Sequence, residues 1–248
     1  MAREPRIRPV SEERPTDTER VPTRIAGLDE RMGGGIPKGF LVLLAGPVGS
    51  MKSSLAFSIL FHAARGGARG LYLSLEQDEE SLLGQMKSLG LDMAGLRQLH
   101  VVDLGAVRKD LEEERADWLD SLCALLERYK KEIGCDILVI DSLDALYSLV
   151  DLQNPRRELF HFFQRMRGLG ATTFLISEMA PDDRRFGKYG VEEFLSDGII
   201  HLRLKEVDTA QVTSVRRYVG VVKMRKTRHD TDYHPFLTGR DGFELVLD

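Results

Sequence analysis

Five short apolar runs alternate along the chain with longer segments of helical period, and this alternation limits the fold more than any other feature of the sequence. Strands that are covered on both faces are almost continuously apolar, and parallel strands need crossover segments between them. The sequence therefore predicts an α/β fold in which helices flank a mostly parallel sheet. The expected strands are Phe40–Ala45, Gly70–Leu75, Leu99–Asp103, Ile137–Asp141 and Thr172–Ser177. The expected helices span about residues 53–66, 79–89, 114–132 and 156–168.

The two ends of the chain depart from this alternation. After Asp197 the strand-like runs follow one another without helices, so we expect antiparallel strands at the C-terminal edge of the sheet. These runs are Gly198–Lys205, Val212–Arg225, a short run near Phe236, and Phe243–Leu247. At the other end, residues 1–20 mix charges of both signs with prolines and are expected to form a flexible arm. Residues 21–248 are expected to form one domain.

The segment Gly46–Ser54, GPVGSMKSS, lies between the first predicted strand and the helix after it. It resembles the phosphate-loop pattern G-x-x-x-x-G-K-[ST], in which backbone N–H groups and the lysine hold nucleotide phosphates and the next hydroxyl binds Mg²⁺. Gly46, Lys52 and Ser53 occupy the required positions, whereas Met51 replaces the second glycine. The alternative is a plain turn that joins the strand to the helix.

The loop predicts an ATP site with Mg²⁺ as cofactor and Lys52 as a catalytic group. The expected nucleotide ligands are Gly49, Ser50, Met51, Lys52, Ser53 and Ser54, and Ser53 is also expected at the metal. A methionine adds bulk where the backbone approaches phosphate and opposes an unusual backbone conformation. Binding is therefore a firmer expectation than fast hydrolysis.

Acidic residues end two of the predicted strands. Asp141 follows the apolar run ILVI, and an aspartate there, on a strand expected next to the phosphate-loop strand, can hold Mg²⁺. Glu76 ends the second strand and could polarise the attacking water. Each has a capping alternative, because either carboxylate could instead cap the helix that follows its strand. Glu178, which ends the fifth strand, could sense phosphate in the same way.

Composition excludes several classes of protein. A formal net charge of −4 gives no general attraction to nucleic acid. No apolar run reaches the roughly 18 residues of a membrane span, and the N-terminus is charged where a secretion signal would be apolar. Cys123 and Cys135 form no metal or redox motif and are expected as buried thiols in a reducing compartment. We therefore expect a cytoplasmic protein without a membrane partner.

Several further segments extend the similarity beyond the phosphate loop. They are Thr23–Asp29 (TRIAGLD), Gly33–Gly39 (GGGIPKG), Lys188–Asp197 (KYGVEEFLSD), Val222–Asp230 (VKMRKTRHD) and His234–Phe236 (HPF). With these, the chain from Thr23 to Leu247 resembles the KaiC-type branch of the RecA/RadA/DnaB superfamily. The resemblance implies a RecA-like P-loop core.

The resemblance also implies an ATPase that forms a ring, typically a hexamer, with ATP between neighbouring subunits. Glu76 matches the catalytic glutamate, although the family often has a second glutamate where this chain has Gln77. Ser88 matches a position close to the nucleotide. Residues that match positions reaching the ATP of the adjacent subunit are Lys223, Met224, Arg225, Thr227 and His229, and of these Lys223 and Arg225 are expected to assist catalysis. Strand alternation would place those two side chains on one face and Met224 on the other.

Three functions stay open at this point. The first is a regulatory ATPase whose hydrolysis rearranges its own ring or a partner protein; a clock kinase is not expected, because no phosphoacceptor pair is evident. The second is a scaffold that keeps ATP bound without hydrolysing it, owing to Met51. The third, not favoured, is a nucleic-acid-binding protein that uses the segments Leu143–Arg157 and Ala180–Gly190.

Overall fold

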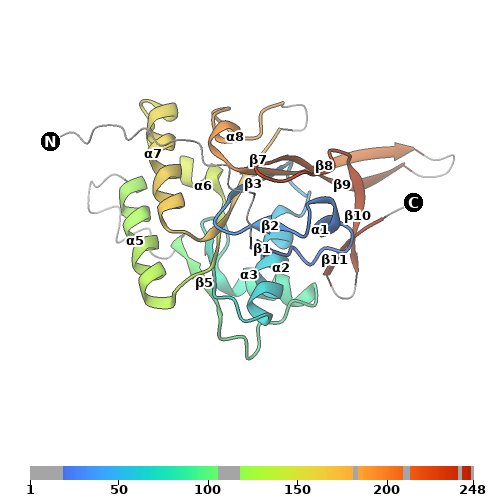
Figure 1. The fold of residues 1–248 in the computed structure, drawn as a ribbon, viewed down its shortest axis with the longest axis horizontal. Coiled ribbons are helices and arrows are strands. Elements are labelled where there is room, and N and C mark those ends of the chain that lie inside the picture. Colours follow the sequence, from blue (N-terminus) through green and yellow to red (C-terminus); the bar gives the residue numbers. More distant parts are fainter. Residues whose placement is uncertain (1–18, 106–117, 181–183, 209–212, 240–241, 247–248) are drawn as a thin grey trace, which may run out of the picture.

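A computed structural model describes residues 19–105, 118–180, 184–208, 213–239 and 242–246, and shows a nine-stranded sheet with helices on both faces (Figure 1). The strand order is β11-β10-β9-β8-β3-β7-β6-β4-β5. The parallel strands are β3 (Leu41–Gly46), β4 (Gly70–Ser74), β5 (Leu99–Asp103), β6 (Ile137–Asp141), β7 (Thr172–Glu178) and β8 (Gly198–Asp208). The antiparallel edge strands are β9 (Thr213–Met224), β10 (His234–Gly239) and β11 (Gly242–Leu245). The predicted α/β architecture is confirmed. One strand direction is wrong: Gly198–Lys205, expected among the antiparallel strands, lies in β8, which pairs parallel with β3 and antiparallel only with β9.

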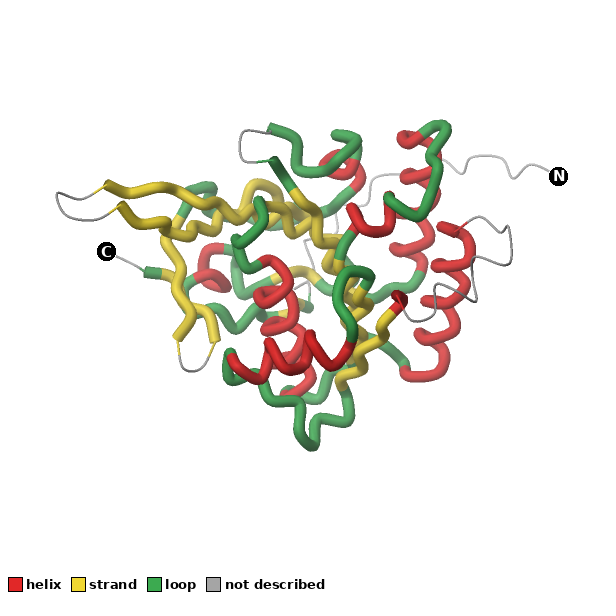
Figure 2. The backbone as a smooth tube through the Cα atoms, turned by 180° about the vertical axis from the view of Figure 1, so that it is seen from behind, coloured by secondary structure: helices red, strands yellow, loops and turns green. Residues whose placement is uncertain are grey.

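Helices cover the two faces of the sheet separately, as Figures 1 and 2 show. On one face, α2 (Lys52–Arg65) and α3 (Glu79–Ser88) bury apolar side chains such as Phe57 against alternate residues of the central strands. On the other face lie α5 (Trp118–Ile133), α6 (Leu143–Tyr147) and α7 (Pro155–Gly168), with Phe163 at their core. Both faces of the central strands are thus buried, which explains their continuously apolar sequences.

One predicted neighbour relation is wrong. The strand that ends at Asp141, β6, does not pair with the phosphate-loop strand β3, because β7 lies between them and pairs with both. Asp141 is therefore one strand further from the loop than expected. Periodicity also missed the shortest elements, which are too brief to show a period. These are β1 (Arg20–Val21), β2 (Ile36–Pro37), α1 (Leu28–Arg31), α6 and α8 (Glu192–Leu195).

The expected N-terminal arm lies outside the described residues up to position 18. Its last residue, Arg20, belongs to β1, which pairs with β2. The Arg20 guanidinium donates to the carbonyl oxygens of Met32 and Gly35 at 3.0 and 2.8 Å and to Thr227 Oγ1 at 3.2 Å. Arg20, expected in the arm, is therefore held by its side chain to residues near both ends of the described sequence.

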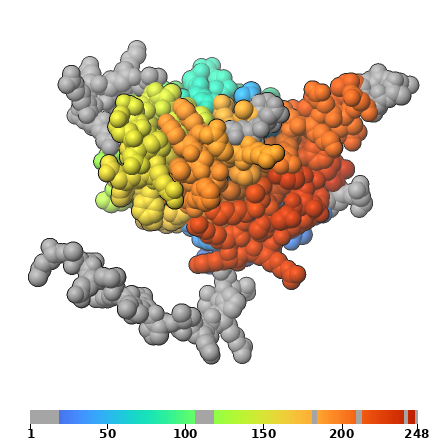
Figure 3. All heavy atoms as spheres, turned by 90° about the horizontal axis from the view of Figure 1, so that it is seen from above, coloured from blue at the N-terminus to red at the C-terminus, as the bar shows by residue number. Residues whose placement is uncertain are grey.

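The β8–β9 pair continues beyond the sheet as a two-stranded ribbon. His201 of β8 pairs with Ala45 near the end of β3, whereas the ladder with β9 runs on to Asp208 and Thr213. Figure 3 shows this ribbon, in orange, extending past the rest of the surface. Among the described residues, no helix is both long and apolar enough to cross a membrane.

The GGG segment yields a matched stability prediction. Gly35 has φ +113°, and a Cβ placed there would lie 2.4 Å from the Val21 carbonyl oxygen, so Gly35→Ala should destabilise the fold by about 1–3 kcal/mol. Gly84, inside α3, has open space around it, so Gly84→Ala should stabilise by about 0.5–1 kcal/mol. Urea denaturation of both variants measures the difference. A neutral Gly35→Ala would show that the β1–β2 pair adjusts freely.

Candidate nucleotide site

The phosphate loop connects the end of β3 to the start of α2. Gly46 ends the strand, where a Cβ would lie 2.6 Å from the Leu202 carbonyl oxygen of the neighbouring strand β8. Gly49 has φ 81°, and Met51, the N-cap of α2, has φ 72° and ψ 30°. Met51 therefore adopts the left-handed conformation of the glycine that it replaces. No side chain caps α2, so the N–H groups of its first turn point toward open space, as an anion site requires.

The Pro47 carbonyl oxygen holds the loop together. It accepts hydrogen bonds from the Ser50 N–H at 3.3 Å, the Ser50 hydroxyl at 2.7 Å and Lys52 Nζ at 3.1 Å. The Ser50 side chain is buried and bonded inside the loop, so this predicted ligand does not line the cleft. Burial lowers the pKa of the Lys52 ammonium, and four nearby carboxylates oppose the shift. These carboxylates belong to Glu178, Asp141, Glu76 and Asp144.

A cleft of about 330 Å³ lies beside the loop. Its walls bring together residues of the phosphate loop, α2, α3, β6 and β7 that are far apart in sequence. The predicted site residues that line it are Gly49, Met51, Lys52, Ser53, Ser54, Glu76, Ser88 and Asp141. Residues not proposed beforehand as ligands also line it, namely Val48, Gln85, Leu89, Ser142, Ile176 and Glu178. The structure thus brings the predicted ligands of the phosphate loop, except Ser50, together with Ser88, Glu76 and Asp141.

Asp141 lies buried at the end of β6. Its Oδ2 accepts the Tyr72 hydroxyl at 2.5 Å. Burial raises the pKa of Asp141, while the Tyr72 and Ser53 hydroxyls beside the carboxylate counteract this shift. The capping alternative for Asp141 is wrong, because the side chain that caps α6 is Ser142, which accepts the Ala145 N–H.

The oxygen pair Ser53–Asp141 suits Mg²⁺. The described part of the chain contains no group of three or more His, Cys, Asp or Glu residues placed to hold a metal. Magnesium commonly uses one or two protein oxygens and completes its shell with phosphate and water, so a hydroxyl and one carboxylate beside a phosphate loop fit it. A zinc-type site, which needs several nitrogen or sulfur ligands, does not fit these residues.

Glu76 extends into the same cleft from the end of β4. The Ser142 hydroxyl donates a hydrogen bond to Glu76 Oε1, which fixes one carboxylate oxygen and leaves the other toward the cleft. The capping alternative for Glu76 is also wrong, since Asp78 caps α3 by accepting the Ser81 N–H at 2.8 Å. Gln77, at the position of the family's second glutamate, bonds along α3 and does not line the cleft.

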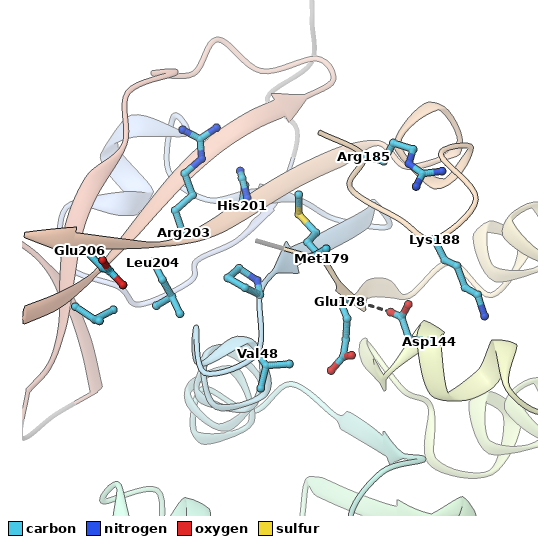
Figure 4. Close-up of a pocket in the computed structure, with 13 residues that line it drawn as sticks. Val48, Asp144, Glu178, Met179, Arg185, Lys188, His201, Arg203, Leu204 and Glu206 are labelled. Carbon is cyan, nitrogen blue, oxygen red and sulfur yellow. Dashed lines mark hydrogen bonds between the residues drawn. The ribbon is translucent and has the colours of Figure 1, made fainter. Parts of the chain in front are cut away.

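Glu178 stands between the cleft and a second, larger cavity of about 890 Å³ (Figure 4). Its N–H donates to Asp144 Oδ2 at 2.7 Å, drawn as the dashed line in Figure 4, so β7 and α6 are joined here. Burial, followed by repulsion from Glu76, raises the pKa of the Glu178 carboxyl. Glu178 thus lines the cleft, and its role in sensing phosphate stays a prediction.

Lys223 and Arg225 lie at the opposite end of the sheet. Met224, the last residue of β9, pairs with Gly198, which pairs with Val42 near the start of β3. The phosphate loop begins at Gly46, four residues further along β3, which corresponds to about 13 Å of strand. The two cations are therefore not brought to the cleft of their own subunit.

The residues around Lys223 and Arg225 confirm the expected alternation. Lys223 and Arg225 both contact the segment 193–197, whereas Met224 is buried and packs near Gly198 on the other face. Thr227 and His229 follow in the loop after β9 and do not line the cleft either. The structure thus divides the predicted site residues into a cleft group and a distant group.

Met51→Gly and Met51→Ala form a matched pair for testing the loop. The Met51 side chain is partly buried against the core, and both variants remove it. Only glycine relieves the left-handed backbone, so Met51→Gly should exceed Met51→Ala in unfolding free energy by about 1 kcal/mol. We also expect the glycine variant to bind ATP more tightly or hydrolyse it faster than the natural protein. Denaturation and phosphate-release assays measure both effects; equal stability of the two variants would contradict the strained-loop interpretation.

Comparisons with known proteins agree with this geometry. The family model described as "ATPase: KaiC" matches residues 21–247. A UPF0273 protein of Pyrobaculum aerophilum is 32% identical over 239 residues, covering 92% of this chain and 83% of the relative. The circadian clock oscillator protein KaiC of Picosynechococcus is 28% identical, and the match spans 92% of this chain but 44% of that longer protein.

A solved structure is similar over its whole length. The KaiC-like protein of Pyrococcus horikoshii superposes with a TM-score of 0.78 at 29% sequence identity, covering 93% of this chain and 100% of that one. The match includes the parallel core and the antiparallel edge that carry the two groups of site residues. The chain belongs to the KaiC family of ATPases and has its RecA-like P-loop fold.

Proposed function

We propose that this protein is a Mg²⁺-dependent ATPase that assembles head to tail into a hexameric ring in the manner of its family, with each ATP between two subunits. The observation that carries the proposal is the separation of charge between the two ends of the sheet. One end is an acidic cleft with a phosphate loop, and the other end is a cationic cluster. Neither end is electrostatically balanced in a single subunit.

At the cleft, the Lys52 ammonium faces four carboxylates, those of Glu178, Asp141, Glu76 and Asp144, and Lys188 lies near Asp144. At the opposite end, three cations, Arg167, Lys223 and Arg225, lie near the carboxylates of Asp197 and Glu193. ATP would add further negative charge to the acidic end. A contact between two different surfaces of identical subunits generates a closed ring or a filament, and opposite charge favours this pairing.

Within the cleft the chain's own residues have separate tasks. The first-turn N–H groups of α2 and the Lys52 ammonium bind the phosphates. Ser53 and Asp141 would hold Mg²⁺, which supplies positive charge beside the phosphates when bound. Glu76, oriented by the Ser142 hydroxyl, accepts a proton from the attacking water. Ser88 lies on the far wall, where it can contact the rest of the nucleotide.

Lys223 and Arg225 complete the site from the neighbouring subunit. Positive charge placed near the γ-phosphate stabilises the transition state, and such arginine fingers contribute roughly 10³–10⁵ in rate. Because β9 places both residues at the far end of the sheet, they can serve only another subunit's ATP. Thr227 and His229 are proposed to approach the same nucleotide from that side, whereas Met224, whose side chain is buried, is proposed to do so through its backbone.

The strained conformation of Met51 favours one alternative. A loop that binds ATP well but reaches the transition state poorly would make the ring a nucleotide-gated scaffold rather than a motor. Only the ATPase releases phosphate in a Mg²⁺-dependent manner, and Glu76→Gln should abolish that release. In either case we propose a regulatory role, with a partner protein as the target of the ring.

Lys52→Ala should weaken ATP binding roughly 10- to 100-fold, because a charge-assisted contact to phosphate is lost. Arg65→Ala, at the other end of the same helix, is the matched control and should bind normally. Titration with a fluorescent ATP analogue measures both. Unchanged affinity in Lys52→Ala would rule out the phosphate-loop assignment.

Mixing two inactive variants tests the action between subunits. Arg225→Ala and Glu76→Gln should each lose most hydrolysis while remaining folded. In an equal mixture, about one quarter of the interfaces combine an intact Glu76 with an intact Arg225 from the neighbour, so about one quarter of the activity should return. Arg228→Ala, which changes an exposed cation close by, should be active alone. No recovery, with mixed rings confirmed by native mass spectrometry, would contradict the interface model.

A further inference from the structure

The residues that hold Lys223 and Arg225 form one continuous segment, Glu192–Asp197, which we call the α8 bracket. Four successive carbonyl oxygens of the bracket accept hydrogen bonds from cationic side chains. Lys223 Nζ donates to Glu193 O at 2.7 Å and to Ser196 O at 2.6 Å. Arg225 donates to Phe194 O at 3.2 Å, and Arg167 donates to Leu195 O. The end of a helix leaves such carbonyls unpaired and favours cations, so α8 supplies a frame for both distant site residues.

The bracket ends in a carboxylate that fixes Arg225 more firmly. Asp197 Oδ1 accepts from Arg225 at 2.8 Å, and Oδ2 accepts from Arg167 at 3.3 Å and from the Leu41 N–H at 3.2 Å. The Arg225 N–H also donates to Asp197 O at 2.9 Å. The Asp197 side chain is only 13% exposed. Arg225 is therefore anchored to the first residue of β3 and to α7 through one acid.

The other end of the bracket is a fully buried acid. Glu192 is 0% exposed, and its carboxylate accepts the N–H groups of Tyr189 at 3.2 Å and Val191 at 2.9 Å. The Tyr189 ring stacks edge-on against Tyr147, with centroids 5.1 Å apart. Burial, followed by the Glu192 charge, raises the pKa of the Tyr147 hydroxyl. Glu192 thus joins the bracket to Tyr147, the last residue of α6, through Tyr189, since the buried Tyr147 hydroxyl has no hydrogen-bond partner among the described residues.

Helix α6 leads from there directly to the nucleotide cleft. It has five residues, or about 7.5 Å, so its two ends move together. At its start, Ser142 donates to Glu76 in the cleft. In its first turn, Asp144 accepts the N–H of Glu178, the acid between the two cavities (Figure 4). Contacts therefore run without interruption from the cleft of a subunit to the cations that it presents.

We propose that α6 and the α8 bracket are a positioning device, through which the nucleotide cleft of one subunit sets the placement of the Lys223 and Arg225 that it offers to the next subunit's cleft. Glu192 and Tyr147 are the positioning residues of this connection. The inference rests on the proposed function, since it assigns a control to the same two cations. Its consequence is that an empty cleft impairs its neighbour's hydrolysis as well as its own.

The electrostatics of the cleft supply a cause for the movement. Phosphate brings negative charge next to Glu76 and Glu178, which already repel one another. Both acids are bonded to α6, one through the Ser142 hydroxyl and the other through its own N–H and Asp144. Any displacement of these acids is therefore transmitted to α6. Coupling between sites requires such an element whose position both sites influence.

Doping rings with Lys52→Ala subunits tests the inference. These subunits have an empty cleft but keep Lys223 and Arg225. Without coupling, activity falls in proportion to the intact clefts, to about one half in an equal mixture. With coupling, both the cleft and its cation donor must be intact, so activity falls to about one quarter. Native mass spectrometry verifies that the two kinds of subunit mix at random.

The same titration is repeated in the Glu192→Gln and Tyr147→Leu backgrounds, with Tyr129→Leu on α5 as the matched control. In the first two backgrounds we expect hydrolytic activity to fall in proportion to the intact clefts. In the control background we expect activity in an equal mixture to fall to about one quarter. Tyr147→Leu keeps the test valid if Glu192→Gln fails to fold. A loss of packing alone would lower activity at every ratio without changing the shape of the curve.

If activity in the natural background fell only in proportion to the intact clefts, the coupling would be overturned. The same conclusion would follow if activity still fell to about one quarter in both the Glu192→Gln and Tyr147→Leu backgrounds. The proposed function fails on different evidence: the mixture of Arg225→Ala and Glu76→Gln would recover no activity. Recovery in that mixture together with a proportional decline on doping would leave the interface model standing and remove the α8 bracket from it.

Discussion

The parallel pairing of β3 with both β7 and β8 is the constraint on which the rest of the structure depends. Parallel strands direct all their carboxyl ends to one edge, so the phosphate loop after β3 meets the acids that end β4, β6 and β7. The antiparallel return of β9 then brings the chain back to the opposite edge. The same sheet that concentrates acids around the nucleotide thus carries Lys223 and Arg225 away from it.

This arrangement makes an isolated subunit electrostatically incomplete at two places. Burial raises the pKa of Asp141, Asp144 and Glu178 near Lys52, and repulsion from Glu76 adds to each shift. At the other end, three cations lie near Asp197 and Glu193. Charges left in such excess are costly within a fold and favour a partner of opposite sign. In the proposed ring, the complementary surface belongs to an identical chain. The same charged residues would then stabilise both the subunit interface and the transition state, so a substitution of one of them changes assembly and hydrolysis together.

Much of the architecture could be predicted because apolar runs and strand-ending acids are local signals. Short stretches of sequence predict β3 to β7, five of the six parallel strands, and the phosphate loop. They also predict the cleft positions of Lys52, Glu76 and Asp141. The order of strands does not, and β7 was therefore not expected between β3 and β6. Contacts between distant residues, such as Tyr72 with Asp141, have no local pattern. Elements of four or five residues, α6 and α8 among them, are too short to show a period.

A β-bulge decides which face of the sheet receives the distant cations. Up to Val221, β9 directs alternate residues toward the α2 face, and strict alternation would place Lys223 and Arg225 there too. The ladder instead shifts between Ile199 and Ile200, so that Val222 is an extra residue on β9. Met224 consequently packs into the α2-side core, while Lys223 and Arg225 turn to the face of α7 and α8. A one-residue insertion reverses every later side chain, and without it neither cation could bind the carbonyl oxygens of α8 or Asp197.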